Sequence, residues 1–317
     1  MNTTRSGWIN GFIGMLIFSG SLPATRAAVV GLDPIFLTGA RGTIAALLGI
    51  IMLGVLRQPP PRWSDVFSLV LVVSGLVIGF PLFTAYALQE ISSAQSLVFI
   101  GLLPLATAVF GVLRGGERPR PAFWLFSGLG SALVVAYAAA QGVTAAPRAN
   151  LMMLAAIVTC GLSYAEGGRL ARRLGGWQVI CWALVVALPV MATLAFFTAP
   201  TSLAEVGAAS WLGLGYVSLF SMLIGCVFWY RGLAQGGIAA VGQLQLLQPF
   251  FGLALAALLL HEEVSPAMLV TTLGVVVCVA GAGRFARKEP NVASMTPEAD
   301  GVGVSDLAPR DATPAKA

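Results

Sequence analysis

Two carboxylates at matched places in the chain are the first candidates for chemistry. Glu117 lies thirteen residues after Pro104, and Glu262 lies thirteen residues after Pro249. A carboxylate at such a place could carry a proton or act in gating. Each glutamate also precedes a proline that could begin a helix, and a carboxylate is favourable at a helix N-terminus. We therefore expect Glu117 and Glu262 to cap the helices that follow them.

The two proline–glutamate pairs belong to a longer internal repeat, in which equivalent positions are 145 residues apart. Eight further residues recur at this offset: Phe83, Leu88, Ala94, Leu102, Leu113, Pro121, Ala122 and Val134 reappear as Phe228, Leu233, Ala239, Leu247, Leu258, Pro266, Ala267 and Val279. The chain therefore contains two copies of one apolar unit, and such internal repeats are typical of membrane transporters. Pro104 and Pro249 each remove a backbone donor, so we expect kinks in the spans that contain them.

The composition makes the lipid bilayer the main solvent of this chain. Of its 317 residues, 57% are hydrophobic and only 10% are charged, whereas soluble domains carry about 25% charged residues. The mean hydropathy is +0.87. The net charge of +5 is scattered over short loops, which argues against a nucleic-acid partner. A single histidine and four cysteines without a CxxC pair predict neither a metal site nor a cofactor.

Ten apolar runs are long enough to cross a hydrocarbon core of about 30 Å. They lie near 8–30, 34–56, 66–88, 93–113, 121–140, 151–171, 177–198, 210–231, 238–260 and 266–284. The predicted fold is an all-α integral membrane protein of ten transmembrane helices, divided into repeats at 8–140 and 150–285. The segment 289–317 is rich in Pro, Ala, Thr and Asp, and we expect it to be a disordered cytoplasmic tail.

The distribution of arginines predicts the orientation in the membrane. Arginines concentrate in alternate loops, on the side of the N-terminus, at positions 5, 57, 62, 114, 118, 120, 169, 172, 173, 231, 284 and 287. Basic loops mark the cytoplasmic side, so both termini are predicted to be cytoplasmic. Because each repeat has five spans, the second enters the membrane from the opposite side. The repeat is therefore expected to be inverted, a route to alternating access.

The two matched segments read LLPLATAVFGVLRGGE and LQPFFGLALAALLLHE, and the first half also contains RSGWINGFIGMLIFSGSLPATRAAV followed by LTGARGTIAALL. In these segments the chain resembles the drug/metabolite transporter superfamily in its EamA-type branch, over residues 8–285. The resemblance implies helices from both halves around a central cavity. It also implies transport of small metabolites such as amino acids or drug-like compounds, often outward. His261 stands where the family usually has glycine.

The predicted function is secondary transport, as an exporter of small metabolites across a bacterial-type inner (plasma) membrane. The expected partners are the bilayer and a small-molecule substrate. The sequence leaves open whether the protein forms a homodimer. An intramembrane enzyme is the first alternative, but one histidine at a loop edge and few buried carboxylates do not favour catalysis. A non-transporting multi-pass scaffold is the second alternative. The chain lacks a GxxxxGK[ST] element, so we expect no ATP hydrolysis.

Three amides in the ninth span are the strongest candidates for substrate contact. Gln243, Gln245 and Gln248 precede Pro249, and their equivalents in the first half are apolar: Val98, Ile100 and Leu103. Gln245 and Gln248 are three residues apart and share a helix face. They could line a wet cavity, or they could form hydrogen bonds between helices.

Further candidates are charged or aromatic. Arg26 and Arg41 could meet a substrate carboxylate, and Arg41 could instead pair with Glu90 or extend to the membrane surface. Glu166 could relay protons, or it could form an ion pair with Arg169, three residues later. Possible walls of the cavity include three aromatic residues: Tyr86, Tyr164 and Trp229.

Overall fold

The computed structural model describes residues 3–140, 146–260 and 266–285, and every regular element within these ranges is helical. The first half contains α1 (Thr3–Ser19), α2 (Ser21–Ala28), α3 (Pro34–Val55), α4 (Trp63–Val72), the π-helical segment η1 (Val73–Gly79), α5 (Phe80–Glu90), α6 (Ser93–Ile100), α7 (Leu103–Gly115) and α8 (Pro121–Ala140). The tail at 289–317 and Glu262 lie outside the described residues.

The second half repeats this order. It contains α9 (Pro147–Leu174), α10 (Gly176–Phe197), the short η2 (Leu203–Glu205), α11 (Ala208–Tyr216), the π-helical η3 (Val217–Gly225), α12 (Cys226–Gly236), α13 (Ile238–Gly242), the 3₁₀ segment η4 (Gln243–Leu247), α14 (Gln248–Leu260) and α15 (Pro266–Phe285). Within the described ranges, each of the ten predicted apolar runs forms a helix or a chain of abutting helices.

Helix length and hydropathy suit a membrane. Among the described residues, five helical stretches are each long and apolar enough to cross one: Pro34–Val55, Trp63–Glu90, Pro147–Leu174, Gly176–Phe197 and Ala208–Gly236. Shorter apolar helices include Leu103–Gly115, Pro121–Leu133 and Leu273–Phe285. Large apolar side chains are exposed along the outside of α3, α8 and α10, for example Ile51, Leu125 and Val190. A bilayer supplies the solvent that such side chains need.

The two halves carry the same irregularities at equivalent positions. The third span of each half widens into a π-helix, at Val73–Gly79 and again at Val217–Gly225. The fourth span of each half is also broken, and the new helix begins at Leu103 in one half and at Gln248 in the other. Pro104 and Pro249 are the second residues of these new helices, so the two prolines mark helix breaks, as expected from their missing N–H.

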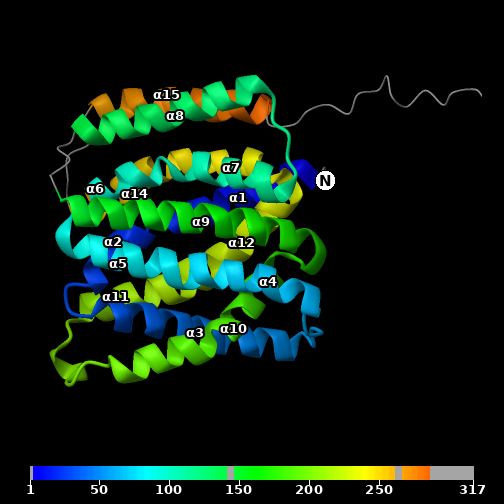
Figure 1. Ribbon diagram of the computed structural model, residues 1–317. Helices are drawn as coiled ribbons and strands as arrows, with labels where there is room; N and C mark the ends of the chain where they lie inside the picture. Colours follow the sequence, from blue (N-terminus) through cyan, green and yellow to red (C-terminus); the bar gives the residue numbers. More distant parts are fainter. Residues whose placement is uncertain (1–2, 141–145, 261–265, 286–317) are drawn as a thin grey trace, which may run out of the picture.

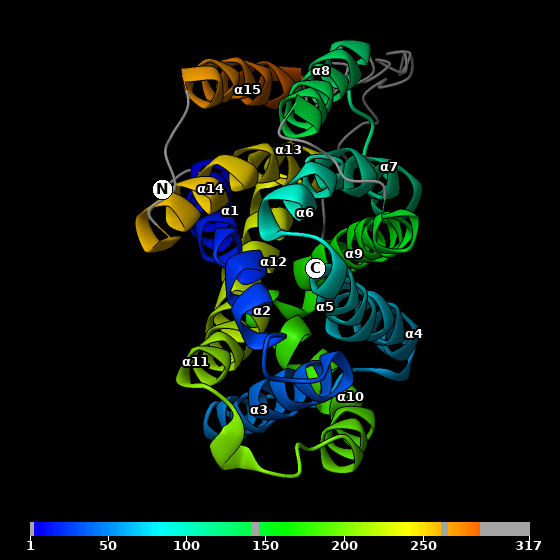
Figure 2. The same ribbon diagram turned by 90° about the vertical axis from the view of Figure 1, so that its left-hand side faces the viewer.

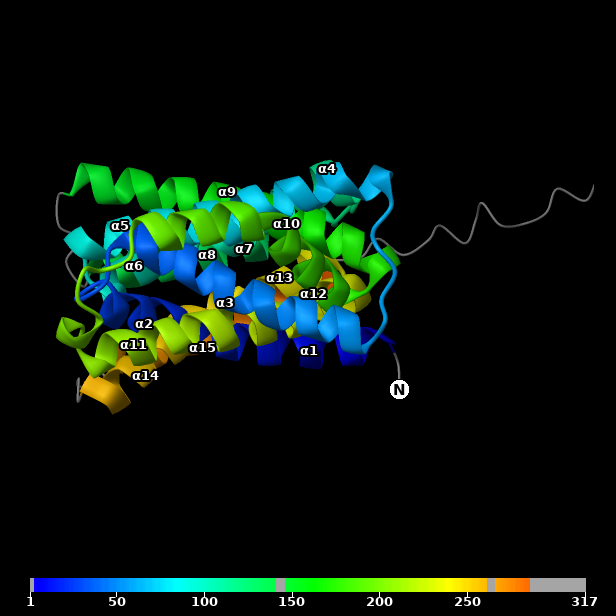
Figure 3. The same cartoon turned by 90° about the horizontal axis from the view of Figure 1, so that it is seen from below.

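The helices form layers that run along one axis (Figures 1 and 3). α8 packs along α15 at one edge, and α3 packs along α10 at the other (Figures 1 and 2). Between these edges, α1 and α2 pack against α12 and α11, while α9 packs against α4, η1 and α5. The first span of each half therefore lies against the third span of the other half, which places the centre of the molecule between the two halves.

Small residues bring α1 and α12 into backbone contact. A Cβ added to Gly232 would lie 2.6 Å from the backbone nitrogen of Gly11, and one added to Gly14 would lie 2.9 Å from the nitrogen of Trp229. Only glycine fits such an approach, as in other closely packed membrane helices. The spacing of Gly7 and Gly11 therefore serves helix packing.

Candidate functional site: a central cavity

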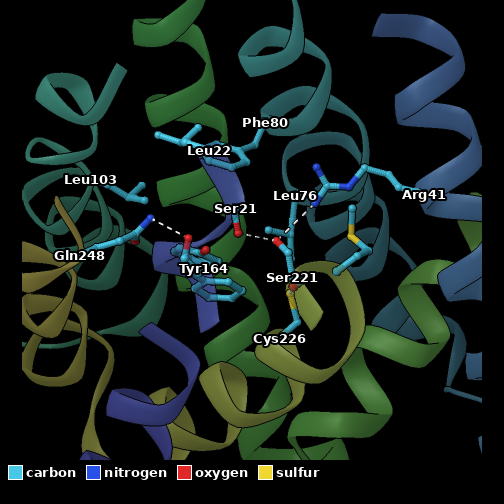
Figure 4. Close-up of a pocket in the computed structure, with 12 residues that line it drawn as sticks. Ser21, Leu22, Arg41, Leu76, Phe80, Leu103, Tyr164, Ser221, Cys226 and Gln248 are labelled. Atoms are coloured by element: carbon cyan, nitrogen blue, oxygen red, sulfur yellow. Dashed lines mark hydrogen bonds between the residues drawn. The ribbon is translucent and has the colours of Figure 1, made fainter. Parts of the chain in front are cut away.

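A cavity lies at the centre of the molecule, between the two halves. Its volume is about 20 Å³, room for little more than one water molecule, within a total of about 410 Å³ that also counts gaps open to solvent. Its walls come from α1, α2, α3, η1, α5 and α7 of the first half and from α9, η3, α12 and α14 of the second (Figure 4). The lining residues are Phe18, Ser21, Leu22, Arg41, Leu76, Phe80, Leu103, Tyr164, Ser221, Met222, Cys226 and Gln248. We call this space the central cavity.

Arg41 is the charged group of the central cavity. It lies in the second turn of α3 and its residue surface is only 4% exposed. One guanidinium nitrogen, Nη2, donates to Ser221 Oγ at 3.4 Å, and Nε has no hydrogen-bond partner among the described residues. The prediction that Arg41 pairs with Glu90 is wrong, because Glu90 pairs with Arg148 on the surface. Extension to the membrane surface is also wrong, because the side chain is buried.

Two serine hydroxyls adjoin this guanidinium. Ser21 Oγ, from α2, donates to Ser221 Oγ, from η3, at 2.8 Å. Ser221 Oγ thus accepts from both Ser21 and Arg41, which uses its lone pairs and leaves its own hydrogen to be donated. Arg41, Ser21 and Ser221 form one polar cluster at one side of the cavity (Figure 4).

Gln248 enters the cavity from the side opposite Arg41 (Figure 4). Its Nε2 donates to the carbonyl of Phe18 at 3.3 Å, and its Oε1 is buried with no partner among the described residues. A free amide oxygen accepts hydrogen bonds from an ammonium or amide group. The sequence-based assignment of Gln248 to a cavity wall therefore agrees with its position.

The other two glutamines do not share this position. Gln243 is fully buried and donates from Nε2 to Ser127 Oγ of α8 at 3.0 Å, so it joins two helices. Gln245 is also fully buried and does not line the central cavity; both of its amide atoms lack partners among the described residues. Gln245 lies in the 3₁₀ segment η4, and Gln248 is the first residue of α14.

Aromatic rings form one wall of the cavity and its support. Tyr164 of α9 lines the cavity and packs against Trp229 with ring centroids 5.3 Å apart. Trp229 is fully buried behind this wall, where it also meets Phe18 edge to face at 6.0 Å. Tyr86 is half-buried in α5 and lines neither this cavity nor the cleft described next.

A larger, mostly apolar cleft lies near the end of the molecule that is remote from the N-terminus. Its volume is about 600 Å³, and it is lined by residues of α2, α6, α11 and α14, among them Pro23 and Leu212, and by Val30 just after α2. Arg26 lies on the wall of this cleft and donates to the carbonyl of Leu88 at the end of α5. Arg26 and Arg41 therefore belong to different spaces.

Glu166 is held in an ion-pair network instead of facing the central cavity. Its fully buried carboxylate accepts from Arg114 Nε of α7 at 3.0 Å and from Arg169 of its own helix. The expected pair with Arg169 is thus present. Nearby, Arg173 pairs with the buried Asp65 of α4. Two arginines on one carboxylate stabilise its charged form, which favours a structural role over proton relay.

Glu117 caps a helix, but not the helix that was expected. Gly116, in the left-handed conformation at φ 67°, ends α7 and turns the chain toward the second half. The Glu117 carboxylate then accepts from the backbone N–H groups of Ile238 and Ala239, at 2.6 Å each, and from Arg172 at 2.8 Å. The prediction that it caps the helix beginning at Pro121 is therefore wrong, because the carboxylate binds the first turn of α13.

Sequence comparison of the halves could have identified one cavity residue that was missed. Leu103 and Gln248 are equivalent positions, and so are Leu76 and Ser221, each pair 145 residues apart. All four line the central cavity. In both pairs the first half supplies leucine and the second supplies a polar group. The same contrast that selected Gln248 would have selected Ser221, whereas Ser21 and Cys226 have no such signal.

Comparison with known proteins decides the family. The model of the EamA-like transporter family matches this chain twice, at residues 5–137 and 147–283. The chain belongs to the EamA-like transporter family. It is thus a multi-pass membrane protein of a transporter family within the drug/metabolite transporter superfamily, built from two EamA units. Membership in this family implies membrane transport without an enzymatic reaction.

Two relatives are similar to this chain in sequence, and one solved structure is similar to it in fold. The uncharacterized transporter YdeK of Bacillus subtilis is 62% identical over 90% of this chain and 100% of its own length. The aromatic amino acid exporter YddG of Ancylobacter novellus is 26% identical over 77% of this chain and 85% of its own. A crystal structure with 23% sequence identity matches the fold with a TM-score of 0.72, over 89% of this chain and 98% of the other.

Proposed function

We propose that this EamA-family protein is a secondary exporter of small metabolites, such as amino acids or drug-like compounds, across the inner (plasma) membrane. The observation that carries the proposal is the central cavity, because its polar groups come from both halves: Ser21 and Arg41 from the first, Ser221 and Gln248 from the second. A scaffold has no need of buried, unpaired polar atoms at its centre. A relative that exports aromatic amino acids supports outward movement of this class of solute.

The proposed mechanism is rocking of two inverted halves around the central cavity. The five-span halves and the reciprocal packing of α1 with α12 and α9 with α5 support an inverted relation. The cavity is narrow, so a substrate larger than a few atoms needs its walls to move apart. We favour uncoupled exchange, because the Glu166 carboxylate is already paired with two arginines. A proton-coupled cycle through Glu166 is the alternative.

Transport is tested by reconstituting the full chain in liposomes without ATP. Vesicles preloaded with an unlabelled amino acid mixture are expected to accumulate a labelled amino acid transiently, by exchange. Vesicles without protein provide the baseline. No exchange of any solute across a broad panel of amino acids and drug-like compounds would reject the transporter in favour of a scaffold.

Orientation is tested separately by cysteine labelling in intact cells. We propose cytoplasmic termini, which places the exposed Arg118 inside and the exposed Glu205 outside. Arg118→Cys is expected to react only with a membrane-permeant maleimide, and Glu205→Cys also with an impermeant one. The four native cysteines are buried and give little background. Reaction of both positions from the same side would contradict the inverted arrangement.

A further inference from the structure

The central cavity contains a buried cation for which the described part of the chain provides no anion. The ionisable groups that face the Arg41 guanidinium are the Cys226 thiol and the Tyr164 phenol, both ordinarily neutral at pH 7. The acids of the described helices lie elsewhere: Asp65, Glu90, Glu117 and Glu166 each pair with other arginines, and Glu205 is exposed on the surface. An ion out of water costs several kcal/mol unless it is paired. A charge kept at this cost at the centre of a transporter is a candidate ligand for substrate.

The surroundings of Arg41 suit a carboxylate. Nε has no partner among the described residues, and Nη2 makes only a long bond of 3.4 Å, so most of the five N–H donors are available. A guanidinium binds a carboxylate through two parallel hydrogen bonds. The hydroxyl of Ser221 retains a hydrogen to donate to the same anion, and Ser21 holds Ser221 in place from the other half of the protein. The single guanidinium of the cavity therefore suits a substrate with one carboxylate.

The opposite wall suits a hydrogen-bond donor. Gln248 has its Nε2 fixed by the carbonyl of Phe18, which leaves Oε1 without a partner. The Gln248 side chain lies across the cavity from Arg41 (Figure 4). Between them, Tyr164 and Phe80 offer ring and apolar surface. The cavity is therefore asymmetric: donors of hydrogen bonds and positive charge on one side, an acceptor on the other.

We propose that Arg41, together with Ser21 and Ser221, binds the carboxylate of the transported substrate, and that Gln248 accepts a hydrogen bond from its amino group. This inference rests on the proposed function and narrows its substrate class. Substrates are small monocarboxylates with a hydrogen-bond donor, such as zwitterionic amino acids. Cationic drug-like compounds without a carboxylate are excluded as substrates. The buried Arg41 guanidinium repels their charge, and they provide no anion to pair with it.

Binding is tested by thermal unfolding of the purified full chain with three ligands that share a phenyl ring. Phenylalanine carries both head groups, 3-phenylpropionate carries only the carboxylate, and phenethylamine carries only the amine. Phenylalanine is expected to raise the midpoint most, 3-phenylpropionate less, and phenethylamine not at all. The common amino acids and short monocarboxylates are screened in the same way. If none of them stabilises the protein, or if phenethylamine stabilises it more than 3-phenylpropionate, the inference is wrong.

Arg41→Gln is the decisive variant. It is expected to weaken phenylalanine binding by at least about 30-fold, since one partner of a buried charge pair is lost. The ligand-free protein should unfold at an unchanged or higher temperature, because an unpaired buried charge has been removed. A purely structural arginine would give a lower midpoint and unchanged affinity, which would refute the proposal. Arg148→Gln, a change at an exposed arginine, is the matched control and should alter neither property.

Two further results keep this inference separate from the proposed function. If Arg41→Gln does not fold, Ser221→Ala provides a milder test, with several-fold weaker carboxylate binding expected and full affinity counting against the site. Carboxylate binding through Arg41 without flux in liposomes would uphold the site and reject the transporter. Flux of neutral or cationic solutes with no carboxylate binding would uphold the transporter and reject the site.

Discussion

Replacing Glu117 by alanine removes a contact that joins the two halves. The carboxylate follows α7 of the first half and accepts two backbone N–H groups from the first turn of α13, in the second half. These N–H groups have no partner within their own helix, because the first turn of any helix lacks them. The Glu117 side chain is only 14% exposed, so its loss leaves donors with little access to water. We therefore expect a local effect at α13 and a global loss of stability.

The magnitude follows from these contacts. Hydrogen bonds to a charged group contribute about 1.5–3 kcal/mol each, and loss of a helix cap costs about 0.5–2 kcal/mol. Water can reach part of the vacated space, so we expect a net loss of about 2–3 kcal/mol, nearer the capping values. For a chain of this size that lowers the unfolding midpoint by roughly 3–5 °C. If the free energy of local opening at α13 falls by about 2 kcal/mol, hydrogen exchange of its amides becomes about 30-fold faster.

Hydrogen exchange and thermal unfolding in detergent measure the two effects. Glu117→Ala is expected to accelerate exchange in the peptide that contains Ile238 and Ala239, and to leave α10 unchanged. Glu90→Ala is the matched control: its carboxylate is 38% exposed and lies 3.8 Å from Arg148, so its removal should cost less than about 1 kcal/mol. Equal shifts in the two variants, or protected amides at Ile238 and Ala239 in Glu117→Ala, would refute the capping argument.

Three other substitutions separate structure from transport. Glu166→Gln should lower thermal stability by about 1–3 kcal/mol, since it leaves two half-exposed arginines without their carboxylate. The dependence of flux on a pH gradient should be the same in the variant and the wild type; a dependence that only the wild type shows would instead establish a relay. Gly232→Ala should destabilise the α1–α12 contact by more than about 1 kcal/mol in an unfolding assay. Gly54→Ala, at a position with open space around it, should be neutral or slightly stabilising in the same assay. Equal unfolding midpoints for the two variants would contradict the close packing. Gln248→Leu should reduce amino acid exchange with little change in stability. Gln243→Leu should lower stability and leave exchange by the folded protein unchanged. Impaired exchange by a stable Gln243→Leu protein would instead place the substrate site near α8.

The helices and their duplication were predictable from sequence because both depend on local features. A span is set by the length of an apolar run, and the repeat is set by identities at a fixed offset. The helix breaks at Leu103 and Gln248 followed from the prolines beside them. The π-helical segments did not follow, since Val73–Gly79 is an ordinary apolar stretch that could form a regular α-helix.

The contacts were less predictable because they depend on which helices meet. Glu117 precedes Pro121 in sequence, but the turn at Gly116 brings its carboxylate to α13. Arg41 was a candidate because it lies within a predicted span, but the sequence did not indicate its neighbours, which are serines from distant spans. Differences in polarity between the two halves were a partial guide: they mark Gln248 and Ser221, which line the central cavity, but also Gln243 and Gln245, which do not.

The matched π-helical segments impose a constraint on chain length. A π turn accommodates a residue more than an α turn, and each residue rotates an α-helix by about 100°. Deleting one residue from Val73–Gly79 should convert the π turn into a regular α turn and leave α5 facing nearly as it does now, because the π turn holds the extra residue. Deleting one residue from the regular turns of α4 should instead rotate α5 by about 100° and turn Phe80 away from the cavity. These spans should therefore tolerate a single-residue deletion only within the π-helical segment. Both copies of the unit have kept this extra turn, at η1 and at η3.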